Sequence, residues 1–152
     1  MAKHKRSTGT ISNRRARFDY NLGDSLVLGM QLTGGETKSL RRGHGDLKGA
    51  YITTKDNELW LINASITGDS SINIPENEKT RPRKLLAKRK EIEDLVAAKK
   101  QGMTIVPLEI LTRGRYIKLR ASSARGKKLY DKRQTIKQRE TRRAMDKAIN
   151  RH

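Results

Sequence analysis

Alternation of apolar and polar positions predicts short strands in the first half of the chain. Leu26, Leu28 and Met30 recur at every second position, which indicates a strand with one apolar face. Residues 50–53 and 59–62 are two β-rich runs with a polar turn between them, and this pattern predicts a hairpin.

A second hairpin is predicted in the other half of the chain. Residues 103–111 and 116–119 are apolar and β-branched, and the short polar segment between them suits a turn. Residues 67–80 are polar and rich in turn-forming residues, so we expect a loop there.

Helical spacing predicts two helices between these strands. Residues 36–42 place charged residues around Leu40, and Gly43 or Gly45 would end that short helix. The longer helix is expected to have Pro82 in its first turn and Gly102 after its last. Its apolar residues at helical spacing are Leu85, Leu86, Ile92, Leu95 and Val96.

These elements favour a mainly β fold, namely a small antiparallel barrel of about six strands, similar to an oligonucleotide-binding (OB) fold, with two to three flanking helices. A small sandwich or an α+β roll would give a similar pattern. We expect the barrel to span residues 13–124, after a flexible basic arm at residues 1–12. Residues 125–152 contain few large apolar residues, so we expect a tail that is disordered when free but able to become helical on a phosphate-rich surface.

Charge is concentrated at the ends and in the second half of the chain. The 152 residues include 35 Lys or Arg against 16 Asp or Glu, with a formal net charge of +19. The net charge is +6 over residues 1–17, −3 over 18–80, +8 over 81–124 and +8 over 125–152. A near-neutral segment flanked by two basic ends and a basic second half indicates a polyanionic partner.

Several function classes find no support in the sequence. The chain has no cysteine, no apolar stretch of membrane-spanning length and no secretory segment behind its basic N-terminus, so we expect a soluble cytoplasmic protein. His4, His44 and His152 lack the spacing of a metal site. No nucleophile motif or Gly-rich phosphate loop is present, so we expect neither a cofactor nor an enzyme.

Two basic clusters suit RNA. In the first, cations that can neutralise phosphates stand beside rings that can stack on bases and an amide that can read a base edge, although a solvated strand start is the alternative. The second is expected at the start of the longer helix, where cations are unfavourable unless an anion compensates them; pairing with nearby acidic residues is the alternative there. The first cluster is Asn13, Arg14, Arg15, Arg17, Phe18 and Tyr20, and the second is Arg81, Arg83, Lys84, Lys88, Arg89 and Lys90.

The tail is the third basic stretch. As a helix it would carry charge on nearly every side, which suits a channel lined by phosphates better than a protein core. Tyr130 stands alone just before the charged run and is a candidate for stacking on a base. A nonspecific basic tail is the alternative.

Several blocks in one order resemble the SsrA-binding protein family, small protein B, whose members bind transfer-messenger RNA in bacterial ribosome rescue. The resemblance covers the chain from Asn13 to its end. The matching stretches are Asn13–Arg17, Asp19–Tyr20, Thr33–Glu36, Lys38–Arg41, Arg81–Leu86, Val106–Leu108, Gly126–Lys128, Asp131–Arg133 and Ile136–Lys137.

The resemblance implies an OB-type barrel bound to the tRNA-like domain of transfer-messenger RNA. The tail would lie in the vacant mRNA channel and decoding centre of the small ribosomal subunit, with Tyr130 able to stack on a decoding-centre base. We expect RNA binding by Asn13, Arg14, Arg15, Arg17, Tyr20, Glu36, Lys38, Arg41, Arg81, Arg83, Lys84 and Leu86. We expect ribosome binding by Gly126, Lys127, Lys128, Tyr130, Asp131, Lys132, Arg133, Lys137 and Arg139.

The chain departs from the family in its first strand, where Val27 stands at a position that is acidic in many members. Thr37 and Arg125 are milder departures. The leading hypothesis is a noncatalytic adaptor, monomeric when free, that delivers transfer-messenger RNA to stalled ribosomes. A general structured-RNA or ribosomal RNA-binding protein is the alternative, and an RNA-processing enzyme is a third.

Overall fold

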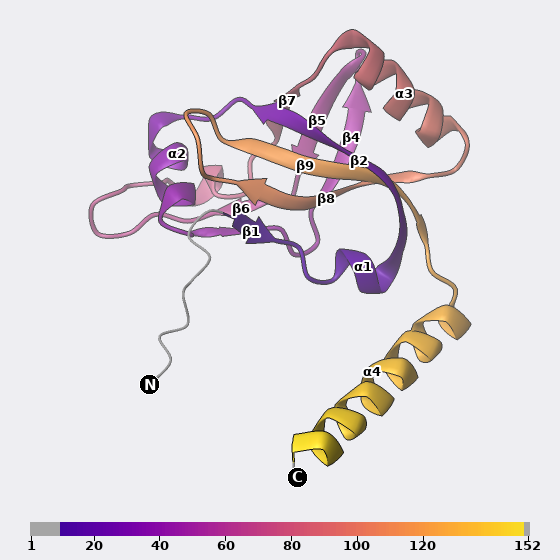
Figure 1. The fold of residues 1–152 in the computed structure, drawn as a ribbon. Helices are drawn as coiled ribbons and strands as arrows, with labels where there is room; N and C mark the ends of the chain where they lie inside the picture. The colour runs from indigo at the N-terminus through magenta and orange to yellow at the C-terminus, as the bar shows by residue number, and fades with distance from the viewer. Residues whose placement is uncertain (1–9, 151–152) are drawn as a thin grey trace.

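Six antiparallel strands close into a barrel around the apolar positions that alternation predicted (Figure 1). The structure is a computed structural model and describes residues 10–150, without the side chains of residues 129–131. The ring closes because β8 pairs with β4 on one side and with β9 on the other. Its strands are β2 (Tyr20–Met30), β4 (Tyr51–Lys55), β5 (Glu58–Ile62), β7 (Arg83–Leu86), β8 (Thr104–Leu111) and β9 (Lys118–Gly126).

Shorter elements surround the barrel. Strand β1 (Thr10–Ser12) adds to the edge of β8, and β3 (Gly45–Asp46) pairs with β6 (Ser65–Ile66). The helices are α1 (Ala16–Asp19), α2 (Gly34–Arg41), α3 (Arg89–Lys100) and α4 (Leu129–Asn150), with a short 3₁₀ helix at Glu76–Glu78. Figure 1 shows α4 outside the barrel, on the side of α1.

The barrel interior is filled by aliphatic side chains. Leu28, Leu59, Leu61 and Leu119 are fully buried and belong to one core cluster. The predicted mainly β fold with an OB-like barrel is therefore confirmed, as is the hairpin of β4 and β5. Asp56 and Asn57 make its turn with positive φ angles of 52° and 60°, a conformation that Asp and Asn tolerate better than most residues.

The predicted start of the longer helix is wrong. Residues 83–86 form strand β7, which pairs with both β5 and β2, and α3 begins only at Arg89. Leu85 points into the core and Leu86 points out, which is strand alternation. Leu85 and Leu86 are adjacent and fit both the spacing of a helix and the alternation of a strand, so the helical interpretation of these two residues is wrong. Arg81, Arg83 and Lys84 consequently lie outside the helix.

The last strand of the barrel is longer than predicted. Strand β9 continues to Gly126, although large apolar residues end at Leu119. Ala121, Ser122 and Ala124 are buried where β9 packs between β2 and β8. Small side chains fill this crowded position, and a search for large apolar residues does not detect them.

The two described ends of the chain form one strand and one helix. The predicted arm at residues 1–12 is partly ordered, because Thr10–Ser12 pair with β8, while residues 1–9 lie outside the described residues. Residues 129–150 have the helical form that the sequence allows for the tail and make up α4. Good helix formers without Gly or Pro account for this helix, and its side chains are mostly exposed.

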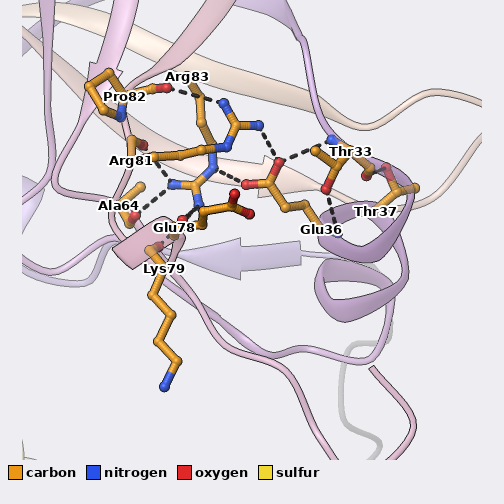
Figure 2. Close-up of polar contacts among 9 residues, drawn as sticks. All are labelled: Thr33, Glu36, Thr37, Ala64, Glu78, Lys79, Arg81, Pro82 and Arg83. Atoms are coloured by element: carbon orange, nitrogen blue, oxygen red, sulfur yellow. Dashed lines mark hydrogen bonds and ion pairs between the residues drawn. The ribbon is translucent and has the colours of Figure 1, made fainter. Parts of the chain in front are cut away.

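A buried ion cluster connects α2 to the long segment before β7 (Figure 2). Arg83 Nε donates to Glu36 Oε2 at 2.6 Å, and Arg81 donates to the other oxygen of the same carboxylate. The side chain of Arg83 is fully buried, and that of Glu36 is 3% exposed. The remaining guanidinium nitrogens of Arg83 donate to the carbonyls of Ala64, Glu78, Lys79 and Arg81.

Glu36 also caps its own helix. Its backbone amide donates to Thr33 Oγ1 at 3.2 Å, and its carboxylate accepts from the Thr33 amide at 3.0 Å. Burial raises the pKa of Glu36, but the hydrogen bonds from Thr33, Arg81 and Arg83 outweigh burial and bring the pKa below its ordinary value. The carboxylate is therefore ionised at neutral pH. It joins α2 to Arg81 and to Arg83 at the start of β7.

Replacement of Glu36 by Gln should destabilise the protein strongly. Removing one member of a buried ion pair leaves an uncompensated charge, here on Arg83, at a cost of about 3–5 kcal/mol. Chemical denaturation at pH 7 measures this difference in the free energy of unfolding. Glu93→Gln is the matched control, since Glu93 pairs with Arg89 on the exposed surface, and we expect a change below about 0.5 kcal/mol. Equal effects of the two substitutions would contradict a structural role for the cluster.

The stability difference between the wild type and Glu36→Gln should depend on pH. Because the folded pKa of Glu36 is lowered, its contribution is complete above the ordinary value of 4.5 and is lost as the pH falls through the folded pKa. Denaturant titrations between pH 7 and pH 3 should show a gap that is constant near neutrality and narrows in acid. A stability difference between the two proteins that grows as the pH falls would contradict this expectation.

Candidate nucleic-acid interface

One outer face of the barrel combines exposed apolar side chains with cations. Val27 on β2 pairs directly with Arg120 on β9, and Gly29 lies between Leu86 on β7 and Lys118 on β9. Directly paired residues share a face of the sheet, so these five residues form one surface, called here the strand face.

The strand face presents apolar groups to solvent. Leu86 is 52% exposed and Val27 is 42% exposed, and they lie on the same face of the sheet. Gly29 keeps the surface shallow beneath Leu86, since a Cβ at Gly29 would lie 3.2 Å from Leu86 Cβ. Arg120 reaches Glu109 at 2.8 Å yet keeps a side chain that is 44% exposed. The face can therefore contact bases or riboses at its apolar centre and phosphates at its edge.

A second cationic surface lies around α1. Arg14 and Arg17 are exposed and line a hollow of about 270 Å³ together with Arg120. Arg17 also lines a neighbouring hollow of about 390 Å³ with Tyr20 and Lys127. This region, called the α1 surface, brings the predicted arginines close to the half-buried ring of Tyr20. Arg15 is exposed and reaches Asp19 at 3.7 Å.

Asn13 has a structural role at this surface. Its side-chain amide donates to the carbonyl of Pro107 at 2.9 Å, and its backbone amide donates to the carbonyl of Leu108 at 2.7 Å. Both bonds attach the segment before α1 to β8. The structure therefore favours Asn13 as a residue that positions the neighbouring arginines, with its amide nitrogen already engaged.

Four residues predicted to bind RNA have partners within the fold, although Arg41 and Lys84 remain exposed or partly exposed. Glu36 and Arg83 are buried in the ion cluster, so direct contact with RNA is excluded in this conformation. Arg41 uses its guanidinium to donate to the carbonyls of Thr112, Gly114 and Arg115. Lys84 pairs with Glu58 at 3.0 Å and is half-buried.

Arg81 and Lys38 retain access to solvent. The side chain of Arg81 is 31% exposed although it donates to Glu36. Lys38 is exposed on α2. Among the basic residues between 36 and 84 that resemble the family, only Arg83 is fully buried, and the others, Lys38, Arg41, Arg81 and Lys84, keep enough exposure to meet a phosphate.

Helix α4 carries the remaining predicted residues. It has seven Lys or Arg residues against three acidic ones. Charge does not cover it completely, because Gln134, Gln138, Thr141 and Met145 follow one another at helical spacing and form an uncharged line. The other predicted residues include the exposed Arg133 and Lys137, whereas the side chains of Tyr130 and Asp131 lie outside the described residues.

The junction between barrel and α4 is short. Gly126 ends β9 opposite Tyr20, and only Lys127 and Lys128 precede α4. Lys128 is exposed and Lys127 is half-buried. A Cβ at Gly126 would meet nothing within 4 Å, so local packing does not explain a glycine there.

Sequence reasoning missed the cations of the strand face. Lys118 and Arg120 alternate with the buried Leu119 and Ala121, and this period-two pattern was a usable signal of outward-facing cations. Their position beside Val27 and Leu86 depends on the pairing of β9 with β2, which no local pattern reveals.

The fold and its surfaces define a class of protein: a small barrel with two cationic surfaces and a basic helix, built to bind nucleic acid. No three His, Asp or Glu side chains among residues 10–150 come together in a way that could hold a metal ion. In the part of the chain that the structure describes, no helix is both long and apolar enough to span a membrane.

Comparison with known proteins identifies the family. A family model described as "SmpB protein" matches residues 10–151. The SsrA-binding protein of Rhodopseudomonas palustris (strain BisB18) is 46% identical over 142 residues, covering 91% of this chain and 90% of the relative. That of Chelativorans sp. (strain BNC1) is 44% identical over 142 residues, covering 92% of each chain.

A solved structure agrees with these relatives. It is described as "tmRNA-SmpB: a journey to the center of the bacterial ribosome", and the matching chain is 37% identical with a TM-score of 0.66. The match covers 79% of this chain and 85% of the other. The chain therefore belongs to the SmpB family, whose curated members are named SsrA-binding proteins.

Proposed function

We propose that this chain is an adaptor that binds transfer-messenger RNA and delivers it to stalled ribosomes for trans-translation. The barrel binds the tRNA-like domain of the RNA, and α4 occupies the vacant mRNA channel and decoding centre of the small subunit. The names of the relatives and the ribosomal setting of the solved structure support this function. The protein acts in the cytoplasm, as a monomer before it binds, and without a cofactor or a catalytic step.

The exposed apolar centre of the strand face is the observation that carries the RNA-binding half of the proposal. A purely electrostatic binder needs cations alone, because phosphates look alike in any sequence or fold. Leu86 and Val27 instead offer a dry surface for unstacked bases or riboses, with Lys118 and Arg120 in position for the flanking phosphates. Recognition of a particular RNA shape follows from the spacing between these two kinds of contact.

Val27 gives this chain an apolar contact at a position that the resemblance to the family implies to be acidic. An acidic side chain at the same place would pair with Arg120, the direct neighbour of Val27 across the sheet. Because Val27 carries no charge, Arg120 pairs only with Glu109 across this part of the sheet and can also bind a phosphate of the RNA. The strand face of this chain is therefore more apolar and more cationic than the family pattern.

The charge of α4 supports the ribosomal half of the proposal. A helix with seven cations, most of them exposed, has no apolar stripe to dock on a protein core. The mRNA channel of a stalled ribosome is lined by phosphates and is vacant beyond the end of the message, so it can accommodate such a helix. RNA binding and ribosome binding are then carried by separate parts of the chain.

Removing α4 should separate the two activities. A chain ending at Lys128 keeps all of β9 and its pairing with β2, so the barrel stays intact. We expect its affinity for transfer-messenger RNA to remain within about threefold of the full chain at about 150 mM salt, where nonspecific contacts are weak. Tag addition on stalled ribosomes should be lost. A parallel loss of RNA affinity would contradict the division of functions.

Replacing Leu86 by Thr should weaken RNA binding with little change in stability. The substitution removes the apolar contact and keeps a residue that suits a strand, so we expect about tenfold weaker binding of transfer-messenger RNA and a change in unfolding free energy below about 1 kcal/mol. Tyr116→Thr is the control, since Tyr116 is 69% exposed in the turn between β8 and β9. Unchanged affinity of the Leu86 variant would exclude the strand face as the RNA-binding surface.

A further inference from the structure

A hollow of about 480 Å³ lies between α1 and the start of β4, next to the two hollows of the α1 surface. Three separate segments line it, namely residues 13–20, residues 48–51 and part of β8. The buried residues Ala16, Ala50 and Val106 give it an apolar floor, and the small alanines keep it open. Ligand pockets have volumes of about 300–1,000 Å³, so this hollow is large enough for one flat group such as a nucleobase.

Two tyrosine rings line this hollow, called here the Tyr51 hollow. Tyr51 is 44% exposed at the start of β4, and Tyr20 is half-buried at the start of β2. Tyr51 precedes the buried Ile52 on the same strand, so its ring lies on the outer side of the barrel. An exposed ring beside an apolar floor is a surface on which an unstacked base can stack.

Charged side chains line the Tyr51 hollow from two of its segments. Lys48 is exposed in the turn before β4, where its backbone amide donates to Asp46 Oδ1 at 2.8 Å and Gly49 has a φ angle of 75°. Arg15 is exposed before α1 and lies 3.7 Å from the carboxylate of Asp19. The two cations suit phosphates, and the carboxylate can accept from an amino group of a base edge.

We infer that the Tyr51 hollow binds one unstacked nucleotide of a structured RNA. The base stacks on Tyr51, while Lys48 and Arg15 neutralise the neighbouring phosphates. RNA fits better than a free nucleotide, because Tyr20 also lines a hollow of the α1 surface and the chain of phosphates can continue onto those arginines. The identity of the RNA rests on the proposed function: it is transfer-messenger RNA or the ribosomal RNA of the stalled ribosome.

Ultraviolet crosslinking followed by mass spectrometry tests the stacking contact directly. One sample contains the full chain with transfer-messenger RNA alone, and the other contains the same complex on stalled ribosomes. We expect a nucleotide adduct on Tyr51 in at least one sample, and the attached RNA fragment then identifies which RNA supplies the base. Tyr116 is exposed but lies outside the hollow, so it should carry no adduct. Absence of a Tyr51 adduct from both samples would overturn the inference.

Matched substitutions measure what the ring of Tyr51 contributes. Tyr51→Leu keeps the apolar bulk but removes the ring, and we expect about tenfold weaker binding in the sample whose RNA carries the adduct. Tyr51→Phe keeps the ring and should bind as the unaltered chain does. Tyr116→Leu removes an exposed ring elsewhere and should also leave the affinity unchanged. Equal losses in Tyr51→Leu and Tyr116→Leu would overturn the inference.

The salt dependence of binding separates the phosphate contact from the stacking contact. Lys48→Gln removes one cation, so the slope of log affinity against log salt concentration should decrease by about one. Tyr51→Leu should leave that slope unchanged, because a ring releases no counterions. Lys55→Gln is the control, since Lys55 is exposed at the other end of β4. The same slope in Lys48→Gln and Lys55→Gln would contradict a phosphate in this hollow.

Two further comparisons keep the outcomes distinct. Both side chains are exposed, so each substitution should leave the midpoint of chemical denaturation nearly unchanged, and Lys48→Gln, in a surface turn, keeps the test valid if Tyr51→Leu is destabilised. Failure of the unaltered chain to bind transfer-messenger RNA would count against the proposed function. Normal binding by the unaltered chain, Tyr51→Leu and Lys48→Gln alike, with RNA alone and on the ribosome, would overturn the nucleotide site only.

Discussion

The pairing of β9 with two neighbours at once is the constraint on which the rest of the structure depends. Its hydrogen bonds to β2 and β8 close the barrel, and its small side chains let the three strands approach. The register places Arg120 beside Val27 and Lys118 beside Gly29, which creates the strand face. The same ladder ends at Gly126 opposite Tyr20, so α4 must begin beside α1.

Two populations of basic residues follow from this architecture. Arg83 donates hydrogen bonds to Glu36 and to backbone carbonyls, and Arg41 donates to backbone carbonyls. These bonds hold loops and helices to the barrel. Arg14, Arg17 and Lys118 keep their charge at the surface. The count of 35 Lys and Arg residues therefore overstates how many of them can contact a polyanion directly. Arginine suits the internal role because its fork of donors can satisfy several carbonyls at once.

Local patterns were sufficient for much of the fold. Alternation identified β2 and both hairpins, and the polar residues before Gly43 identified α2. Patterns failed where tertiary contacts decide the outcome. The adjacent leucines of β7 fit a strand or a helix until β5 and β2 flank them. The buried stretch of β9 has small residues, whose burial only its neighbours reveal.

The candidate site was predicted only in part, again because tertiary contacts decide which side chains are buried. The basic segment around α1 and the cations of α4 were visible as clusters in the sequence. The burial of Arg83 with Glu36 was not, because the two residues are 47 positions apart and the resemblance to the family does not say whether a shared residue binds or supports. The ring of Tyr20 was visible as a possible stacking group, but the hollow that it shares with Tyr51 needed the fold.

The most direct test of the account is a competition measurement with the full chain. The complex of the purified protein with its host's transfer-messenger RNA is challenged with excess tRNA and bulk rRNA at about 150 mM salt, where phosphate contacts alone bind weakly. The account predicts that the complex persists, because the strand face adds contacts that depend on RNA shape. Equal displacement by any structured RNA would contradict it and identify a general RNA-binding protein.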